Sequence, residues 1–554
     1  MDVLEIANKI TSGFLIVFDL MEPVPFNIDK IDWDMIASNS PSSFSLYLHA
    51  LSPFKFLLQA YNISPQGRYI DSAIKFIESW LDYNSNEQIK KNRFLWRDHP
   101  VSSRVMVLID LIGLPYLYKS TFIDKIHGLI LAHADWLNTN GNYTYKHNHG
   151  IMQDIALVKC SYYVGGGKGK AYLSNAKKRL INQMKFAFPN KHAQSENSTT
   201  YYFLVKRLLN EVNTIFQEKG DKFGSKTSSF LDSLGDFEVF LYMPNLTTPL
   251  IGETYGEPKQ NPTKILKKEY ADFITKKVKG YRSLSKRNGV FLNDGYIFLR
   301  NSKICETDSD TTWLSFKSGY ITPTHKHCDD LSFVLFSKGY DIFIDPGFVR
   351  DEFSNEITAY FKRCFAHNLV VVDNNSYTLN TKSKSKTKLT NYSSNKDFDY
   401  SAGVNVEYPN VELKRELYFY PDSDQLIIVD TSKTNSAHKY SQLFHLGKNI
   451  SVIKQDWRQT VLKIGESDYS LIIEQFNKSD SIENFCGDSN KPYSLYSIGM
   501  HKYIPTETLL YNWTCKNLLA TTLISIVRNN EVINSKSYIS SSQNKIISRY
   551  RKTI

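Results

Sequence analysis

Cysteine is scarce in this chain of 554 residues, and its placement excludes a disulfide framework. The six cysteines are widely spaced and form no CxxC pair. Long apolar runs are also missing: no stretch approaches the roughly 20 apolar residues of a membrane helix, so we expect no membrane insertion. The N-terminus lacks the basic and apolar segments of a signal peptide, because Asp19 interrupts its best run. We therefore expect a soluble, cytoplasmic protein as written, with a periplasmic or secreted location left open.

Acidic side chains are outnumbered, since 56 Asp and Glu stand against 67 Lys and Arg for a formal net charge of +11. A basic surface favours an acidic partner such as a polyanionic glycan, a nucleic acid or an anionic membrane. The chain contains no nucleic-acid-binding motif, so we expect no nucleic-acid partner. Aromatic residues make up 14% of the chain, which suits sugar-binding platforms and large cores equally. The sequence leaves the oligomeric state open.

Hydrophobic periodicity divides the chain into two halves. Before residue 260, apolar residues recur at helical spacing. The clearest segments are 70–84, 101–118, 120–137 and 171–188. Later segments alternate apolar and polar residues between turn residues, as β-strands do. We predict a multidomain α+β protein with a helical domain over 1–260, a linker over 261–285 and an antiparallel β-sandwich over 286–554. Within the sandwich, the polar stretch 380–396 is expected to be a solvated loop.

A group of metal-binding residue types lies in the second half. The apolar runs 331–336 and 340–344 are separated by Ser-Lys-Gly and predict a β-hairpin. On this hairpin His327 and Asp345 can face each other, and His367, expected on a third strand, can close the group. Two imidazoles and one carboxylate suit Zn²⁺ or a similar divalent ion with an open coordination position. The alternative is a set of ordinary hydrogen-bonded side chains on a hairpin.

These elements carry a resemblance to a known family. HKHCDDLSF, then IDPG, then AHNLVVVD resemble the C-terminal β-domain of heparinase II/III-type polysaccharide lyases, where HxHxDxLSF, DPG and AHN(T)VVVD occur in this order. The resemblance implies that the helical half is an incomplete (α/α) toroid. It also implies β-elimination on a uronic-acid-containing polysaccharide and a structural or supporting metal, Zn²⁺ by its ligand set.

The helical half contains two further matching segments. The NHG of this chain resembles a family segment that contributes an Asn and a His to the active site, and these correspond to Asn148 and His149. SENSTTYY resembles the family's E-(H/N)-S-P-x-Y-H, whose catalytic tyrosine corresponds to Tyr201. The resemblance implies that Asn148 neutralises the substrate carboxylate and that Tyr201 is the acid. His149 and His325 are the candidate bases. The side chains expected to bind substrate are Trp96, Arg104, Glu196, Tyr202 and Arg363. The turn PLIGETYGE resembles the family's PxIGD, with Glu253 in place of Asp.

Three functions therefore remain open at the level of sequence. The first is a lyase acting on a glycosaminoglycan-like, alginate-like or bacterial capsular or exopolysaccharide chain. The second is a non-catalytic carbohydrate-binding or polysaccharide-assembly protein on the same fold. The third is a hydrolase, which would need two carboxylates as acid and base, and the sequence shows no convincing pair. The sequence does not name the sugar, nor does it decide between endo and exo action.

Overall fold

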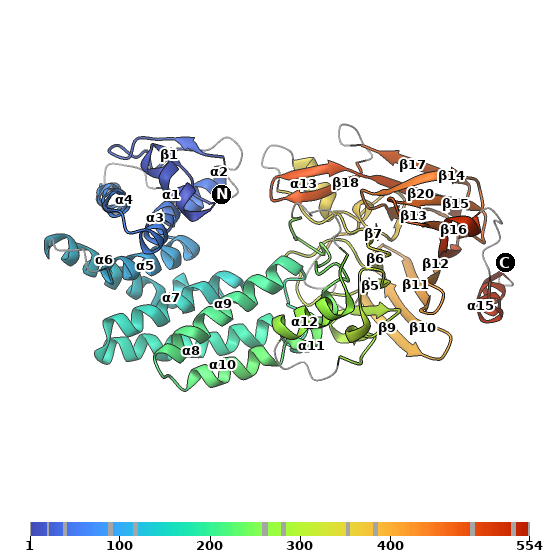
Figure 1. The fold of residues 1–554 in the computed structure, drawn as a ribbon, viewed down its shortest axis with the longest axis horizontal. Helices are drawn as coiled ribbons and strands as arrows, with labels where there is room; N and C mark the ends of the chain where they lie inside the picture. Colours follow the sequence, from blue (N-terminus) through green and yellow to red (C-terminus); the bar gives the residue numbers. More distant parts are fainter. Residues whose placement is uncertain are drawn as a thin grey trace. The chain divides into compact units, whose positions relative to one another are not determined.

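The chain folds into two compact units, shown in Figure 1. The computed structural model describes residues 2–18, 22–36, 41–86, 92–114, 120–256, 264–278, 284–350, 355–379, 386–487, 493–532 and 539–551. The first unit comprises residues 1–187 and 204–228, and the second comprises residues 188–203 and 229–554. This division by packing differs from the predicted boundary near residue 260, because the segments 188–203 and 229–256 pack with the strands although they are partly helical.

The first unit is built from amphipathic helices. They are α1 (Val3–Thr11), α2 (Pro41–His49), α3 (Ser52–Ile63), α4 (Gly67–Ser85), α5 (Asp98–Ile112), α6 (Ser120–Asn138), α7 (Asn148–Val164) and α8 (Gly166–Ala187), with the short strands β1 (Phe14–Leu15) and β2 (Val24–Pro25). α9 (Thr199–Glu218) and α10 (Phe223–Asp232) are each divided between the units. The periodicity in the sequence correctly predicted α4, α5, α6 and α8. Residues 115–118 of the predicted segment 101–118 lie outside the described residues.

The reversal between α7 and α8 shows how short the connections are. Gly165 alone separates the two helices, with φ of 63°, and Gly166 follows with φ of 57°. Glycine readily adopts such positive φ angles, so the chain reverses within two residues and α8 packs against α7. None of the helices in the described ranges has the length and apolar character that a bilayer-spanning segment needs.

The second unit contains three larger antiparallel sheets. A five-stranded sheet has the order β3 (Gly289–Phe291), β4 (Tyr296–Arg300), β5 (Trp313–Lys317), β6 (Ser332–Ser337) and β7 (Tyr340–Phe343). A four-stranded sheet has the order β17 (Ser481–Cys486), β20 (Glu507–Cys515), β13 (His438–His445) and β8 (Val370–Val372). An eight-stranded sheet has the order β14 (Ile450–Gln455), β15 (Gln459–Ile464), β16 (Tyr469–Gln475), β21 (Leu519–Arg528), β12 (Gln425–Thr434), β11 (Val411–Tyr420), β10 (Asp399–Asn405) and β9 (Thr387–Ser394).

Smaller elements complete this unit. They are α11 (Gly235–Leu241), α12 (Lys267–Lys277), α13 (Asn355–Lys362), the 3-10 turn η4 (Cys364–Ala366), β18 (Leu495–Gly499), β19 (Lys502–Pro505), α14 (Asn529–Val532) and α15 (Ser541–Arg551). Of these, α12 lies within the stretch predicted as a linker. α13 and η4 lie between the hairpin β6–β7 and β8, so they lead the chain from one sheet to another.

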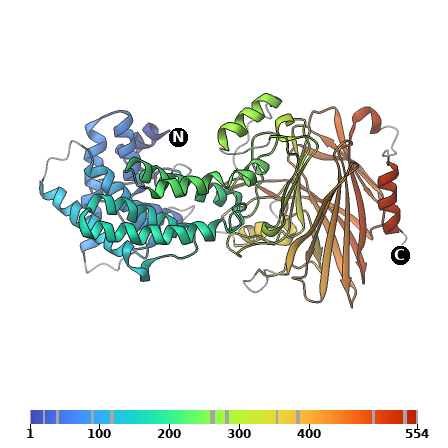
Figure 2. The same ribbon diagram turned by 90° about the horizontal axis from the view of Figure 1, so that it is seen from below.

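One apolar core joins the three larger sheets. Phe333 of β6, Ile428 of β12 and Leu443 of β13 all belong to it. Successive strand residues point to opposite faces. Leu417 of β11 therefore faces this core, whereas the neighbouring Tyr418 packs on the other face of the sheet with Ile547 of α15. Figure 2 shows α15 as the red helix beside the C-terminus, next to this sheet. Inner strands such as β12 and β21 are therefore buried on both faces over most of their length.

His49 gives the helical unit a testable pH dependence. It is fully buried at the end of α2, with the rings of Trp33 and Tyr83 each 5.8 Å away. Burial, followed by the charge of Arg104, lowers the pKa of His49 to about 4. The unfolded chain therefore takes up a proton near the ordinary pKa of about 6.5, while the folded chain does so only near pH 4. Stability from this residue is complete above pH 6.5 and falls as the pH drops.

We expect this effect to cost about 2 kcal/mol of unfolding free energy between pH 7 and pH 5. His49→Phe removes the titrating group and keeps an aromatic ring in the same place. Urea unfolding at several pH values should show a smaller loss of stability at low pH for the variant than for the wild type. Parallel curves for the two proteins would show that His49 does not contribute to acid sensitivity.

Candidate functional site

The segment 188–203 of the second unit positions Tyr201 in the first turn of α9. Just before the helix, Asn197 adopts a left-handed conformation with φ of 59°. Its side-chain amide donates to two carbonyl oxygens of the loop 322–324, at 2.5 and 3.2 Å. These hydrogen bonds attach the start of α9 to the loop that leads into His325.

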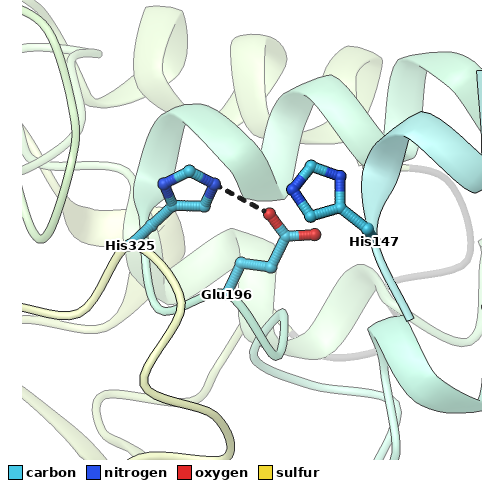
Figure 3. A group of neighbouring side chains, drawn as sticks. All are labelled: His147, Glu196 and His325. Carbon is cyan, nitrogen blue, oxygen red and sulfur yellow. Dashed lines mark ion pairs between the residues drawn. The ribbon is translucent and has the colours of Figure 1, made fainter. Parts of the chain in front are cut away.

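His325 stacks on Tyr201 and lies between two carboxylates. The two ring centroids are 3.7 Å apart and the ring planes differ by 11°. The Nδ1 atom of His325 is 2.9 Å from Oε2 of Glu253, and its Nε2 atom is 3.2 Å from Oε2 of Glu196. Figure 3 shows the second of these pairs, with the imidazole edge directed at the Glu196 carboxylate. Lys362 forms an ion pair with the other oxygen of Glu253.

Burial and these charges set the protonation of the group. Burial raises the pKa of Tyr201 well above its usual value, and negative neighbours, including Glu253 and Glu196, raise it further. Burial opposes the ionisation of Glu253, but His325 and Lys362 outweigh it and lower the Glu253 pKa to about 2. Burial would lower the pKa of His325, yet the two carboxylates raise it above its usual value. Tyr201 is therefore a neutral phenol at neutral pH, able to donate its proton.

The structure brings His327, Asp345 and His367 together in a second group. Each offers a ligand atom, and these atoms lie within 4.8 Å of one another. All three residues are buried, and His367 Nδ1 is 3.0 Å from Asp345 Oδ2. Both ring nitrogens of His327 and Nε2 of His367 have no hydrogen-bond partner among the described residues. Burying such atoms without a partner is costly, and a metal ion would satisfy them. Two imidazoles and a carboxylate fit Zn²⁺.

The three metal-ligand candidates come from different elements. His327 precedes β6 and Asp345 follows β7, as the predicted hairpin requires. His367 was expected on a third strand, and it lies just before that strand instead of within it. It follows η4 and precedes β8, which pairs with β13 in the four-stranded sheet. The group therefore links two sheets of the β-unit.

The sequence patterns did not reveal a network of buried charges in the loop before β6. Both carboxylate oxygens of Asp329 accept from Lys317 Nζ, at 2.8 and 2.9 Å. Lys326 also pairs with Asp329, and its Nζ donates to the main-chain oxygen of His327 at 2.8 Å. All of these charged side chains are buried. Losing one partner would leave a buried charge uncompensated, so the network fixes the main chain that carries both histidines. The Lys and the two adjacent Asp within HKHCDD were the available signal.

The first unit holds a separate group at the start of α7. As predicted, a polar loop enters the helix here, with His147 as the N-cap and Asn148 as the first helical residue. The Nδ1 atom of His149 is 3.0 Å from Oδ2 of Asp98, which also accepts from the Thr144 hydroxyl at 2.8 Å. Burial opposes ionisation of Asp98, but these partners outweigh it and lower its pKa below the usual range. With Nδ1 facing a carboxylate, Nε2 of His149 is the nitrogen that can accept a proton.

Arg104 has a structural position in place of the predicted substrate contact. Its side chain is fully buried. The guanidinium donates to Nε2 of His133 at 2.8 Å, to the main-chain oxygen of His49 at 2.6 Å and to that of Leu95 at 2.9 Å. Its hydrogen-bonding capacity is directed into the protein, so we assign Arg104 to the packing of the helical unit.

The other expected substrate contacts differ in their exposure. Tyr202 is buried, and its hydroxyl donates to the main-chain oxygen of Leu234 at 3.3 Å, so it also belongs to the core. Trp96 is half-buried, with Nε1 donating to Asn84 at 2.9 Å. Arg363 is exposed at the start of η4, so its guanidinium is accessible to an anionic ligand.

Two known protein families match most of this chain. The family described as Heparinase II/III N-terminus matches residues 4–279, and the one described as Heparinase II/III-like, C-terminal matches residues 285–503. A crystal structure of heparinase III has a TM-score of 0.78 at 16% identity, over 95% of this chain and 85% of its own. A mutant of the heparan sulfate lyase HepC from Pedobacter heparinus has a TM-score of 0.70 at 14% identity, over 96% and 84%.

A more distant structural match has a similar extent. The chondroitin AC lyase from Streptomyces coelicolor A3, solved with chondroitin sulphate, has a TM-score of 0.56 at 8% identity, over 97% of this chain and 80% of its own. A search of curated proteins found no match.

Together, the fold and the matching families define the class of the protein as a polysaccharide lyase. An incomplete (α/α) toroid is followed by an antiparallel β-sandwich, which confirms the predicted fold class. The chain belongs to the heparinase II/III-like family.

Proposed function

We propose that the protein cleaves a uronic-acid-containing acidic polysaccharide by β-elimination. The observation that carries this proposal is the pairing of Tyr201 with His325: a buried phenol, kept protonated, stacks at 3.7 Å on an imidazole. The lyases that share the fold are described as acting on heparan sulfate or bound to chondroitin sulphate. The net charge of +11 favours such a polyanion. The candidate substrates are glycosaminoglycan-like, alginate-like and bacterial capsular or exopolysaccharide chains.

The reaction assigns one task to each of three side chains. Asn148 would donate hydrogen bonds to the uronate carboxylate, where negative charge develops as the C5 proton leaves. His149 would accept that proton on Nε2, because Asp98 holds its Nδ1. Tyr201 would give its proton to the glycosidic oxygen as the bond from C4 to that oxygen breaks. The electron pair of the C5–H bond then forms the C4=C5 double bond of the product.

His325 is less suited than His149 to be the base. Both of its ring nitrogens face carboxylates, those of Glu253 and Glu196, whereas only Nδ1 of His149 does so in the contacts described above. We propose that His325 orients the phenol of Tyr201 through the ring stack. The group of His327, Asp345 and His367 would hold Zn²⁺, which would supply a rigid link between the five-stranded sheet, which carries the loop of His325, and the four-stranded sheet.

The two carboxylates beside His325 also bear on the hydrolase alternative. Glu196 and Glu253 lie on opposite edges of one imidazole, a pair that the sequence did not show. Each is engaged with that imidazole, and Glu253 also pairs with Lys362. An inverting or retaining hydrolase needs one carboxyl group free to protonate the leaving oxygen and the other free to act as base or nucleophile. The observed contacts therefore favour the lyase.

Ultraviolet absorbance during incubation with a panel of polysaccharides tests the proposal. The panel contains heparosan, heparan sulfate, hyaluronan, chondroitin, alginate and acidic capsular glycans, with Zn²⁺ supplied. β-Elimination creates a C=C bond conjugated to the carboxylate, so we expect absorbance to rise with at least one polymer. New reducing ends without that rise would establish hydrolysis. Binding to a polymer without either change would support the non-catalytic carbohydrate-binding or assembly protein.

A further inference from the structure

The orientation of His325 depends on contacts from two other segments of the β-unit. His325 itself adopts a left-handed conformation with φ of 54°, which only a few per cent of residues other than glycine adopt. A ring stack alone does not distinguish the imidazole from the same ring flipped by 180°. A carboxylate hydrogen-bonded to Nδ1 distinguishes the two orientations, because the flipped ring would place a carbon atom where the hydrogen bond is made. The Glu253 contact at 2.9 Å is therefore specific to one orientation of the ring.

Glu253 is held against His325 by its main chain as well as its side chain. Its N–H donates to the main-chain oxygen of His325 at 3.1 Å. The preceding Gly252 has φ of 63°, and a Cβ atom there would lie 2.4 Å from the oxygen of Asn197 and 2.8 Å from that of His325. Only glycine permits this close approach. The turn thus carries Glu253 to a position where its carboxylate reaches the imidazole.

Lys362 completes the arrangement from the end of α13. Its ammonium group pairs with the Glu253 oxygen that does not face His325. Its main-chain oxygen accepts from the N–H of Cys328 at 2.9 Å, three residues after His325. Each oxygen of the Glu253 carboxylate is therefore engaged, one by His325 and the other by Lys362. The main chain of Lys362 is in turn hydrogen-bonded to the loop of His325.

We infer that Glu253 and Lys362 are positioning residues for His325, with Glu253 setting the orientation of the imidazole and Lys362 holding Glu253. This inference rests on the proposed lyase function for its catalytic consequence. Neither residue is assigned a proton transfer, because both oxygens of Glu253 are already engaged. The aspartate of the family's PxIGD turn is one methylene shorter than Glu253, so the longer side chain of this protein has the reach to bridge His325 and Lys362.

The kinetic test uses Glu253→Gln, Glu253→Ala, Lys362→Met and Lys362→Arg with heparan sulfate, or with whichever polymer of the panel the wild type cleaves. We expect Glu253→Ala and Lys362→Met to lower kcat 10- to 100-fold while KM stays within twofold, because a misoriented imidazole impairs the reaction and not binding. Lys362→Arg keeps the ion pair and should retain at least a third of the wild-type kcat. Glu306→Ala, which removes an exposed ion pair with Lys303, is the matched control and should match the wild type.

A second measurement does not need catalysis. Diethyl pyrocarbonate modifies imidazole nitrogens that are free to react, and peptide mass spectrometry locates the product. We expect Glu253→Ala to increase the modification rate of His325 at least fivefold, with His192 in the same digest unchanged. Glu253→Gln, of nearly equal volume, keeps the test usable if the Ala variant folds poorly. Its His325 modification rate should lie between that of the wild type and that of Glu253→Ala. An unchanged His325 rate in both Glu253 variants, or kcat within twofold of the wild type, would overturn the inference. If the wild type cleaves no polymer, the proposed function fails, and the modification rates alone decide the positioning role.

Discussion

Tyr201→Phe is expected to lower kcat by about 10²- to 10⁴-fold, the range typical of losing a general acid or base. The variant removes only the hydroxyl, so the ring that stacks on His325 at 3.7 Å remains. Burial and negative neighbours keep the phenol protonated, and phenylalanine has no proton to give to the leaving oxygen. The rate of absorbance increase on the substrate polysaccharide measures the effect. Affinity for the polymer should stay within about threefold, because the rest of the site is unchanged.

Tyr202→Phe is the matched control for this experiment. Tyr202 is the next residue of α9, and its hydroxyl donates to the main-chain oxygen of Leu234 inside the core. Its loss should reduce the free energy of unfolding by about 1 kcal/mol and leave kcat within twofold. The opposite result, with activity lost in Tyr202→Phe and kept in Tyr201→Phe, would show that the alignment with the family's tyrosine is off by one residue.

Removal of the metal is the second large effect that we expect. An ion present at about 1,000 times its dissociation constant stabilises the folded chain by about 4 kcal/mol. His327→Ala and Asp345→Asn should reduce the zinc content from about one ion per chain to less than a tenth, and should lower the free energy of unfolding by a similar amount. Dialysis of the wild type against a chelator should have the same effect, reversed by Zn²⁺. Elemental analysis together with urea unfolding measures both quantities.

His438→Gln serves as the control for the metal experiment. His438 lies in the same unit and pairs with Asp373, outside the group of His327, Asp345 and His367. The zinc content of the His438→Gln variant should equal that of the wild type. A wild-type protein that contains no metal and whose stability does not change with chelator or Zn²⁺ would show that the three residues form only a hydrogen-bonded cluster.

Local patterns in the sequence predicted local structure well. Residues 70–84 carry apolar side chains at helical spacing and form most of α4. The runs 331–336 and 340–344 form β6 and β7. Such patterns succeed because the periodicity of an element reports which of its faces is buried.

The prediction was wrong where tertiary position overrides composition. The stretch 380–396 was expected to be a loop; its residues 380–385 lie outside the described residues, and Thr387–Ser394 forms β9. This strand lies at the edge of the eight-stranded sheet and pairs only with β10 among the described strands. Many of its side chains face solvent, so its polar composition resembled that of a loop. The burial of Arg104 and Tyr202 likewise could not be predicted from the sequence, because the type of a residue does not indicate how deeply it lies in the fold.

The sequence by itself determined the change from a helical to a β half and the family, and it supplied Tyr201 and the metal group as predictions. These follow from short motifs and local periodicity. Only the tertiary structure decided that Glu253 and Lys362 meet at His325, since these contacts join residues 72 and 109 positions apart along the chain. A hydrogen bond depends on the distance and direction between two atoms. For residues so far apart in sequence, the packing of the turn at Gly252 and of α13 against the β6 loop sets both.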